Sequence, residues 1–428
     1  MRIGIFDDRH ASNLGPLTVT RPAAELRCGL TTLAEKHARH FGTQGPVGHL
    51  CRPAVAGAVS DGIRFVNDPL WLRSTATVLV NGRWLPPSRP ANRPAPTFTE
   101  LYASGSYLAL CQGEIAYLVL DPTQLLAVSP ATLEDCLDDW SRTLPVREVG
   151  GQMIRRPWDL VEQNAAQIQR DFDAVYDVSD AGYRPYAFLH VGPADRLLIH
   201  PSARIDPMVA ADTTHGPVVI GRDAVITSFT RLEGPCFIGA GTHVLGARIR
   251  AGTSIGPHCR IGGEVECSII QGFTNKYHDG FLGHSYLGEW VNIAAGTITG
   301  DLRNDYQPIT VPLNGQDIPS GLTKVGSYIG DHTRTGLSVL LNCGSVLGPF
   351  SQVLPTGQFA PRHIPAFHRY GPRGLKHEAS LEKLLTTADL AMRRRGRELT
   401  PSLESVYRAA AGLRMHHTAN EAAWRKSA

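Results

Sequence analysis

The sequence predicts an α/β domain followed by a parallel β-helix and a short helical tail. Up to about residue 195, short aliphatic runs alternate with helical stretches. From residue 196, aliphatic residues recur every six positions. Beyond residue 356 the chain turns extended and then helical. We therefore expect three parts, at residues 1–195, 196–356 and 357–428.

The composition excludes several classes of protein. Lys and Arg number 42 and Asp and Glu 39, a net charge of +3 that gives no indication of nucleic-acid binding. Charge interrupts the first apolar run at once, and no later segment approaches the roughly 20 apolar residues of a membrane span, so we expect neither a signal peptide nor a membrane protein. The eight scattered cysteines lack metal-ligand spacing, which indicates reduced, buried thiols in a cytoplasmic protein.

The first part reads as alternating strands and helices, which predicts a mainly parallel sheet. A helical connector is expected at 157–177, because Leu160, Ala165, Ile168 and Phe172 recur at three-to-five-residue steps. The predicted strands are RIGIF (2–6), ATVLVNG (76–82) and IAYLVL (115–120), and the predicted helices are 22–40 and 131–143.

The second part carries a six-residue repeat, which fits neither the 3.6-residue period of a helix nor the two-residue period of an isolated strand. Such hexads predict a parallel β-helix in which each hexad forms one flat side of a triangular turn, with its aliphatic residue pointing inward. The residues in phase are Ile220, Ile226, Leu232, Ile238 and Val244, then Ile249, Ile255 and Ile261, then Leu287, Ile293 and Thr299, then Ile329, Thr335, Leu341, Leu347 and Val353.

The repeat is interrupted twice, at 271–288 and from Asp301 to about Lys324. Insertions in such a coil project as loops, and loops on a repeat scaffold commonly bind ligands. The polar residues of the two breaks are Lys276, His278, Asp279 and His284 in the first, and Asp301, Arg303, Asn304 and Asp305 in the second.

The tail begins with an extended stretch at 356–378 that is rich in Pro, His and Arg. Leu381, Leu384, Leu385 and Ala388 then mark an amphipathic helix. Thr400-Pro401 is a suitable cap for a further helix, and we expect this part to pack on the coil or on a neighbouring subunit.

Long motifs carry a resemblance to a known family. The run GHSYLGEWVNIAAGTITGD resembles the acetyltransferase core of the bacterial bifunctional N-acetylglucosamine-1-phosphate uridylyltransferase / glucosamine-1-phosphate N-acetyltransferase family. A divergent branch, often labelled putative sugar nucleotidyltransferases, is more similar. Its motifs occur here as FDDRHASNLGPLTVTRPAAELRCG (6–29), PWDL (157–160) and GGEVECSIIQGFTNKYHDGFLGHSYLGEWVN (262–292). The resemblance implies a nucleotidyltransferase-like first domain, a left-handed coil and a homotrimer.

The resemblance also implies roles for residues of the coil. His284 matches the general base that takes a proton as an amine attacks a thioester, a task that suits a neutral imidazole. Lys276 matches a lysine that pairs with the substrate phosphate, and Asp301 lies where the family has an asparagine on the acceptor side. Asn292 matches a sugar-phosphate or thioester contact, or else forms an asparagine ladder within the coil. Tyr286 matches only after a one-residue shift.

The first domain departs from active sugar nucleotidyltransferases. The glycine-rich phosphate loop is missing, and Arg83 stands where the metal-binding aspartate is expected. Nucleotidyl transfer needs a divalent cation, so Asp7 and Asp8 would have to bind Mg²⁺ if the domain is active. Four basic residues are either phosphate ligands or ordinary surface charges: Arg9, Arg21, Arg27 and Lys36.

The resemblance implies acetyl transfer from acetyl-CoA to an amino-sugar phosphate, with His284 as base, in the supply of UDP-N-acetylglucosamine or a related sugar nucleotide. Sugar-1-phosphate nucleotidyl transfer in the first domain is a further implied activity. Two alternatives stay open: a nucleotidyltransferase whose coil is a trimerisation scaffold, and a non-catalytic sugar-nucleotide-binding protein. The expected partners are a sugar phosphate and a nucleotide, and neither nucleic acid nor a membrane.

Overall fold

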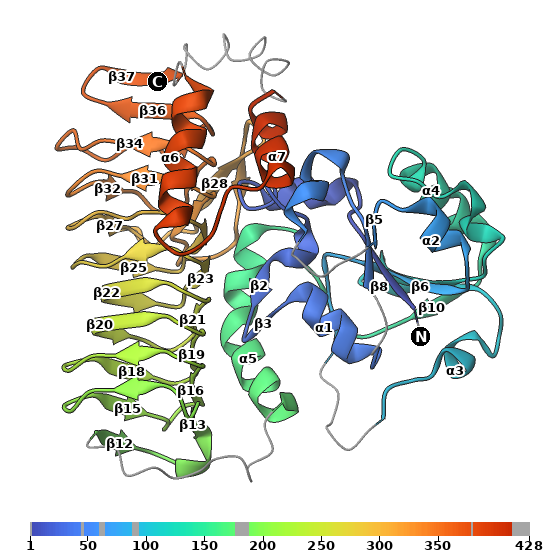
Figure 1. Cartoon of the computed structure of the whole chain (residues 1–428), viewed down its shortest axis with the longest axis horizontal. Helices are drawn as coiled ribbons and strands as arrows, with labels where there is room; N and C mark the ends of the chain where they lie inside the picture. The colour runs from blue at the N-terminus through green and yellow to red at the C-terminus, as the bar shows by residue number, and fades with distance from the viewer. Residues whose placement is uncertain are drawn as a thin grey trace.

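The structure is a computed structural model that describes residues 2–43, 47–59, 65–87, 94–175, 188–377 and 380–412. An α/β domain lies beside a tall coil of parallel strands, and the long helix α5 (Pro157–Val175) stands between them (Figure 1). Two further helices, α6 (Leu381–Arg393) and α7 (Pro401–Gly412), pack near one end of the coil. The predicted fold class, including a left-handed β-helix, is confirmed.

The α/β domain is built on a seven-stranded sheet of order β10-β8-β9-β6-β1-β4-β5. The sheet is mainly parallel, as predicted, because only β9 runs against its two neighbours. The three predicted strands correspond to β1, β6 and β9. The strands are β1 (Ile3–Phe6), β4 (Val47–Leu50), β5 (Phe65–Val66), β6 (Thr77–Asn81), β8 (Tyr107–Cys111), β9 (Glu114–Leu120) and β10 (Val146–Glu148); β7 (Trp84–Leu85) pairs with β11 (Gln152–Met153) outside the sheet.

Helices cover this sheet and connect it to the coil. Besides α5, they are α1 (Leu33–His40), α2 (Pro69–Arg73), α3 (Phe98–Tyr102) and α4 (Leu133–Thr143). The helix expected at 131–143 is α4, and the connector expected at 157–177 is α5, although residues 176 and 177 lie outside the described ranges. Among the described residues, no helix combines the length and apolarity needed to cross a membrane.

The prediction of a helix at 22–40 is wrong for the first half of that range. Pro22 is followed by a short 3₁₀ turn and by the small hairpin of β2 (Arg27–Cys28) and β3 (Thr31–Thr32), and α1 begins only at Leu33. The side chain of Thr32 caps the helix in a reciprocal capping box with Glu35, which fixes its start. Gly29, at φ 74°, turns the hairpin.

The coil is a stack of rungs with buried aliphatic residues. The residues predicted to point inward form one continuous core, in which Ile220, Leu232, Ile261 and Leu287 are at most 1% exposed. The face toward the α/β domain is a nine-stranded parallel sheet of β13 (Leu197–Ile199), β16 (Val218–Ile220), β19 (Cys236–Ile238), β21 (Thr253–Ile255), β23 (Ile269–Gly272), β26 (Tyr286–Glu289), β30 (Ser327–Ile329), β33 (Ser345–Leu347) and β35 (His363–Ile364).

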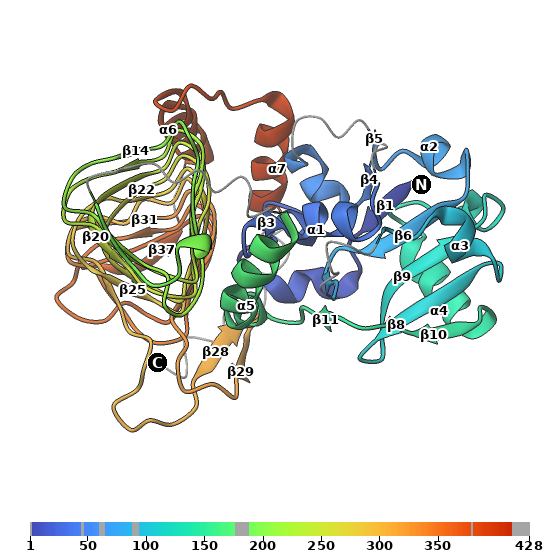
Figure 2. The ribbon, with the colours of Figure 1, turned by 90° about the horizontal axis from the view of Figure 1, so that it is seen from below.

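The two remaining faces share strands, because long β20 and β22 extend from one face onto the next. Figure 2 looks along the coil and shows its closed outline. The strands are β12 (Leu189–Val191), β14 (Arg204–Ile205), β15 (Ala210–Asp212), β17 (Val225–Ile226), β18 (Arg231–Glu233), β20 (His243–Ile249), β22 (Arg260–Glu266), β24 (Asn275–Lys276), β25 (Phe281–Gly283), β27 (Ile298–Thr299), β31 (Arg334–Thr335), β32 (Leu340–Leu341), β34 (Gln352–Val353), β36 (His368–Gly371) and β37 (Gly374–His377).

Both breaks in the repeat change the outline of the coil. The first contains β24 and β25, which continue the stacking on β22. The second leaves the coil after Asp301 and forms an antiparallel hairpin of β28 (Thr310–Leu313) and β29 (Gln316–Pro319). This hairpin lies beside α5, and its Val311 and Leu313 belong to a buried cluster shared by coil and α/β domain (Figure 2). The expected loop is therefore partly a packed structural element.

Apolar and polar contacts join the domains over a wide area. Trp158 of α5 packs with Tyr328 and Val346 of the coil in the same shared cluster. At the far end of the interface, α7 contacts both the coil residue Phe350 and the 3₁₀ segment Pro53–Ala58 of the α/β domain. The tail helices expected from the sequence are thus present and pack on the coil, while residues 413–428 lie outside the described ranges.

The cysteines agree with the expectation of reduced thiols. All eight are free, and all but Cys136 and Cys267 are buried.

A buried ion pair anchors the α/β domain to the coil. Arg21 donates to Asp331 at 2.7 Å and lies 3.4 Å from Glu289, and Thr20 donates its hydroxyl to the same Asp331 oxygen at 2.6 Å. Asp331 is 3% exposed. Breaking such a pair leaves an uncompensated buried charge, which costs far more than the pair contributes when intact.

We predict that Arg21→Met lowers the free energy of unfolding by about 3 kcal/mol, since Asp331 would keep its buried charge without a cation. Urea unfolding followed by tryptophan fluorescence measures this loss. Arg142→Met is the control, because the Arg142–Asp139 pair is exposed and its loss should change stability by less than about 1 kcal/mol. Equal effects of the two substitutions would contradict an anchoring role for Arg21.

Candidate functional site

The sequence-predicted base, His284, lies at a corner of the coil where the backbone turns with φ 45°. Its Nδ1 hydrogen bonds to Oδ2 of Asp301 at 2.8 Å. The side chains are only 11% and 14% exposed, respectively. Two residues that were singled out separately from the sequence therefore form one His–Asp pair.

The insertion creates this pair. The chain leaves the coil after Asp301 and returns at Val325, whose N–H donates to the Asp301 carbonyl oxygen at 2.8 Å. On the next residue, the N–H of Gly326 donates to the carbonyl oxygen of His284 at 2.9 Å. Gly283 provides the space, because a Cβ there would lie 2.4 Å from Oδ2 of Asp301. The side chain of Asp301 thus rests against bare backbone beside the imidazole.

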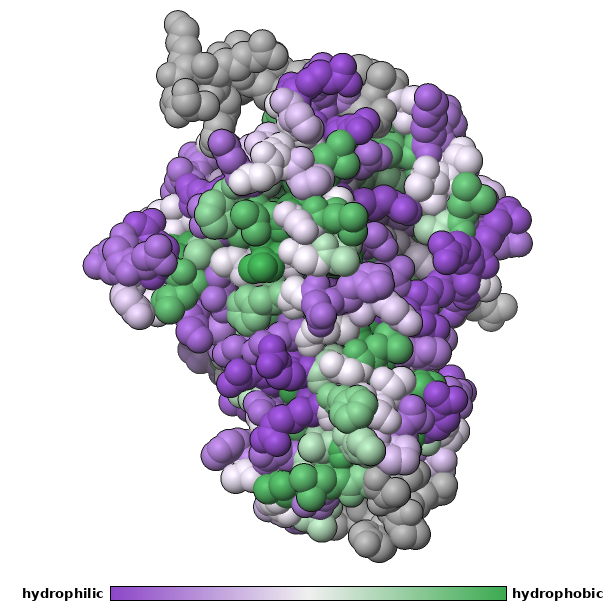
Figure 3. All heavy atoms as spheres, turned by 90° about the vertical axis from the view of Figure 1, so that its left-hand side faces the viewer, coloured by the Kyte–Doolittle hydropathy of each residue, from purple (hydrophilic) through white to green (hydrophobic). Residues whose placement is uncertain are grey.

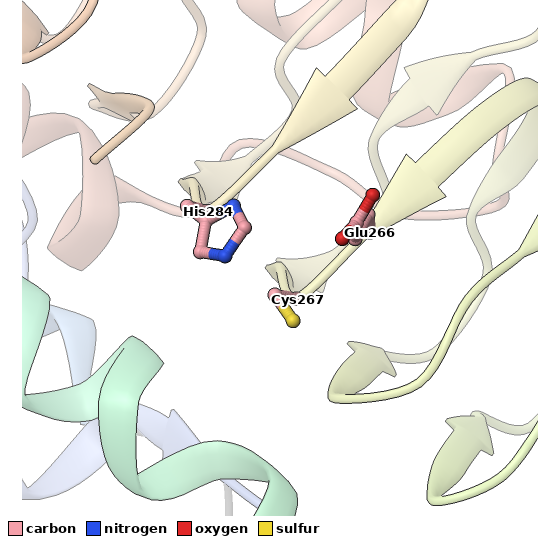
Figure 4. A group of neighbouring side chains, drawn as sticks. All are labelled: Glu266, Cys267 and His284. Carbon is pink, nitrogen blue, oxygen red and sulfur yellow. The ribbon is translucent and has the colours of Figure 1, made fainter. Parts of the chain in front are cut away.

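The turn of the coil preceding His284 brings two further groups to the site. Glu266 ends β22 and Cys267 follows it, and the polar atoms of these two side chains and His284 lie within 4.8 Å of one another (Figure 4). This is the one group of His, Cys, Asp and Glu in the described residues close enough to share a metal ion. The side chains of Arg250 and Lys324 lie 3.9 and 3.7 Å from the carboxylate oxygens of Glu266. These cations already balance its charge, so we assign the group no metal.

The electrostatics of the site favour a protonated, strongly basic imidazole. Burial lowers the pKa of His284, but the hydrogen bonds to Asp301 and Cys267 outweigh it and raise the pKa to about 9. Glu162 of α5 also interacts with His284 electrostatically, while burial raises the pKa of that carboxyl group. Nδ1 is engaged by Asp301, so a proton exchanged with a substrate would pass through Nε2, on the side of Cys267.

The expected phosphate-binding role of Lys276 does not fit its surroundings. The side chain is 1% exposed, and its ammonium group donates to the carbonyl oxygens of Gly262, His278 and Gly280 at 2.7, 3.2 and 2.8 Å. Burial lowers its pKa to about 8. Its three donors satisfy the backbone of the first break, which makes Lys276 a structural residue of the loop.

Tyr286 and Asn292 lie in structural positions. Tyr286 is fully buried at the domain interface, where its hydroxyl donates to Gln271 at 2.6 Å and accepts from the N–H of Arg27 at 2.8 Å. Asn292 lies between Asn275 and Arg334 on successive turns and accepts a hydrogen bond from Asn275 at 3.4 Å. This is the ladder arrangement that the sequence left open for Asn292.

The basic residues expected to bind nucleotide do not converge. Arg9 is exposed and pairs with Glu134 and Asp138 of α4. Lys36 is buried against Asp171 of α5 at 2.5 Å. As described above, Arg21 binds the coil, and Arg27 donates from its guanidinium to the carbonyl oxygen of Leu30. Arg9, Arg21 and Lys36 thus each pair with a carboxylate of another element of the fold.

Asp7 and Asp8 do not fit a magnesium site. Arg83, 1% exposed, donates to both carboxylate oxygens of Asp8 at 2.8 and 2.6 Å and to Glu114 at 2.7 Å. The carboxylate of Asp7 accepts from the N–H of Ala23 and from Arg52. A guanidinium group thus holds the carboxylate that a cation would need, and we derive no step through Mg²⁺.

Sequence reasoning missed Glu162, Glu266 and Cys267. One signal was available for Cys267: it stands at the corner one turn before His284, with Glu266 opposite Gly283 in the register of β22 and β25. Glu162 carries no such signal, because its approach to His284 depends on how α5 docks on the coil.

Comparison with known proteins finds relatives among sugar nucleotidyltransferases and acetyltransferases. Residues 3–178 match the family described as sugar nucleotidyl transferase. Over 98 residues the chain is 36% identical to a bifunctional sugar-1-phosphate nucleotidylyltransferase/acetyltransferase of Sulfurisphaera tokodaii, covering 22% of this chain and 24% of that one. Over 171 residues it is 30% identical to the putative uncharacterized acetyltransferase YaiX of Escherichia coli (strain K12), covering 37% and 74%. The chain belongs to the same acetyltransferase family as YaiX and is a divergent relative of the bifunctional nucleotidyltransferase/acetyltransferases.

The matched region spans 24% of the Sulfurisphaera tokodaii relative and 20% of the bifunctional protein GlmU of Methanococcus vannielii. Two solved structures are also similar. The N-acyltransferase AntD of Bacillus cereus, in complex with dTDP and 3-hydroxybutyryl-CoA, is 15% identical with a TM-score of 0.22, over 49% of this chain and 93% of that one. The polysialic acid O-acetyltransferase OatWY is 14% identical with a TM-score of 0.23, over 45% and 88%.

We predict that the His284 imidazole titrates near pH 9, because Asp301 and Cys267 stabilise its charged form. NMR of ¹⁵N-histidine-labelled protein measures this, with the signal assigned by its loss in His284→Gln. In Asp301→Asn the inflection should move to lower pH, since burial then dominates. His332, whose pKa burial lowers to about 3, should stay neutral throughout and serves as the control. An inflection below pH 7 whose position does not change in Asp301→Asn would contradict the prediction.

Proposed function

We propose that the coil transfers an acyl group, with acetyl-CoA as donor, to the amino group of a sugar phosphate, with His284 as the general base. The observation that carries this proposal is the contact of 2.8 Å between Nδ1 of His284 and Asp301. Such a partner fixes the tautomer and orientation of an imidazole and stabilises the cation that forms when it accepts a proton.

The chemistry follows from this geometry. The amine of the acceptor attacks the thioester carbonyl carbon, and Nε2 of neutral His284 takes the proton that the nitrogen loses. Asp301 supports the imidazolium until the proton passes on to the departing thiolate. Because the pKa of His284 is about 9, only about one imidazole in a hundred is neutral at pH 7, so the rate should rise as the pH approaches 9.

The proposal extends to the pathway, the cellular location and the domain units of the protein. The name of the Sulfurisphaera tokodaii relative joins sugar-1-phosphate nucleotidyl transfer to acetyl transfer, which supports a place in sugar-nucleotide supply such as that of UDP-N-acetylglucosamine. Free, mostly buried thiols support a cytoplasmic location. We also propose residues 1–195, 196–356 and 357–428 as the units of the chain.

We propose that the chain forms a homotrimer through its coil. Exposed apolar residues of the coil support this, among them Phe229, Leu337 and Phe359 at 74%, 65% and 58% exposure. Figure 3 shows apolar patches on the coil side of the molecule. Light scattering should give about three times the chain mass of 46.4 kDa, and a monomer mass would contradict the trimer.

Nucleotidyl transfer in the α/β domain is the second candidate function. The family match over residues 3–178 favours it. The hydrogen bonds of Arg83 to Asp8 weigh against it, because they occupy the carboxylate expected to bind the metal. We therefore place acyl transfer first.

The proposed function predicts thiol release from acetyl-CoA in the presence of glucosamine-1-phosphate. His284→Ala should reduce kcat by a factor of roughly 10² to 10⁴, the usual contribution of a general base. A parallel assay follows pyrophosphate release from UTP, N-acetylglucosamine-1-phosphate and Mg²⁺, where we expect no product.

His200→Gln is the matched control, because His200 is an exposed histidine near the opposite end of the coil. It should leave thiol release unchanged. Thiol release that survives in His284→Ala would exclude His284 as the base. Pyrophosphate release without thiol release would make nucleotidyl transfer the first candidate function and contradict acyl transfer.

A further inference from the structure

A cavity of about 240 Å³ opens beneath the hairpin of the second break. The residues that line it come from three elements: the start of the insertion, strand β28 with the residue before it, and two successive turns of the coil. They are Arg303, Ile309, Thr310, Asn342, Cys343 and Arg362.

This cavity adjoins the His–Asp pair. Strands β27 and β32 stack in parallel, and the N–H of Gly300 donates to the carbonyl oxygen of Leu341 at 2.7 Å. A Cβ on Gly300 would lie 3.2 Å from the sulfur of Cys343. Asn342 and Cys343 thus lie one rung from Asp301, which holds His284. With rungs about 4.8 Å apart, the nearest wall of the cavity is about 10 Å along the coil from His284, and Arg362 lies one rung farther.

The groups that line the cavity are mainly hydrogen-bond donors. Arg362 donates to the carbonyl oxygen and hydroxyl of Thr310 at 2.8 and 3.1 Å and to Asp317 at 3.1 Å. Arg303 donates to Asp305 through Nε and a terminal nitrogen. A guanidinium carries five N–H groups, so these contacts orient both cations and leave donors for a ligand.

Asn342 adds a neutral donor. Its Oδ1 accepts the N–H of Cys343 at 2.8 Å, which assigns its NH₂ group as a donor at the cavity. Two guanidinium groups, an amide NH₂ and a threonine hydroxyl match the acceptor oxygens of a phosphate group. The nearby Asp305 and Asp317 reduce the net charge of the site, so recognition rests on the oriented hydrogen bonds more than on long-range attraction.

We propose that this cavity binds a phosphate group of a substrate of the acyl transfer, through Arg303, Arg362 and Asn342. The inference rests on the function proposed for His284 and adds the recognition of one substrate. A sugar phosphate and the phosphates of acyl-CoA offer the same chemistry, and their separate Michaelis constants distinguish the two sources.

The experiment measures KM for acetyl-CoA and for glucosamine-1-phosphate in Arg303→Gln and Arg362→Gln. We expect one of the two KM values to rise roughly tenfold or more in both variants, with kcat little changed, since a charge-assisted hydrogen bond is lost. A rise for glucosamine-1-phosphate identifies the acceptor as the source, and a rise for acetyl-CoA identifies the donor. Both KM values unchanged within about twofold would overturn the proposal.

Two controls separate recognition from folding. Arg362 also holds the hairpin through Thr310, whereas the side chain of Arg303 donates to Asp305, outside the hairpin strands. Arg303→Gln therefore tests the cavity with an intact hairpin. Arg204→Gln removes an exposed arginine from a distant part of the coil and should leave both KM values unchanged. Free glucosamine, which lacks the phosphate, should show no difference between variant and wild type if the acceptor is the source.

A direct binding measurement keeps the test independent of turnover. Calorimetric titration of the wild type with pyrophosphate should show binding that Arg303→Gln weakens roughly tenfold or more. If the wild type releases no thiol but binds pyrophosphate in this way, the proposed function fails while the cavity stands as a phosphate site. No binding of pyrophosphate by the wild type, together with unchanged KM values, overturns the cavity.

Discussion

The rest of the structure depends on the stacking of successive turns of the coil. Each rung buries an aliphatic side chain on the one below, so residues one turn apart are held side by side along the whole coil. Cys267 and His284 stand at the same corner on successive turns, and Cys343 lies one rung beyond Asp301, which holds His284. The chemistry of the site is thus positioned by a rigid scaffold, while the inserted segment supplies the variable groups.

The α/β domain keeps its family motif but uses much of it to bind the coil. Thr20 and Arg21 contact Asp331, and the N–H of Arg27 donates to Gln271 and to the hydroxyl of Tyr286. The hydroxyl of Ser254 donates to the carbonyl oxygen of Gly29 at 2.8 Å. Arg21 and Arg27, expected to bind phosphates, therefore stabilise an interface, and α5 brings Glu162 into electrostatic contact with His284.

The sequence allowed the coil, its breaks and the importance of His284 to be predicted, because hexad periodicity and a break in it are local signals. The partnership of His284 with Asp301 was not predicted, although Asp301 follows His284 by the same 17 residues that separate Cys267 from His284, because the two residues lie in separate interruptions of the repeat. The burial of Lys276 follows from three carbonyl oxygens that only the folded loop brings together. Likewise, Arg83 was recognised as an anomaly, but its capture of Asp8 depends on tertiary contacts.

The proposed function requires that the acyl acceptor binds at the coil, with His284 as its base, and that Arg83 rather than a metal holds Asp8. The measurement to make is a crystal structure of the wild type with CoA, an amino-sugar phosphate, UTP and Mg²⁺ together. We expect the acceptor nitrogen within hydrogen-bonding distance of Nε2 of His284, and Asp8 still bound to Arg83. Nucleotide and metal at Asp7 and Asp8, with nothing beside His284, would contradict it.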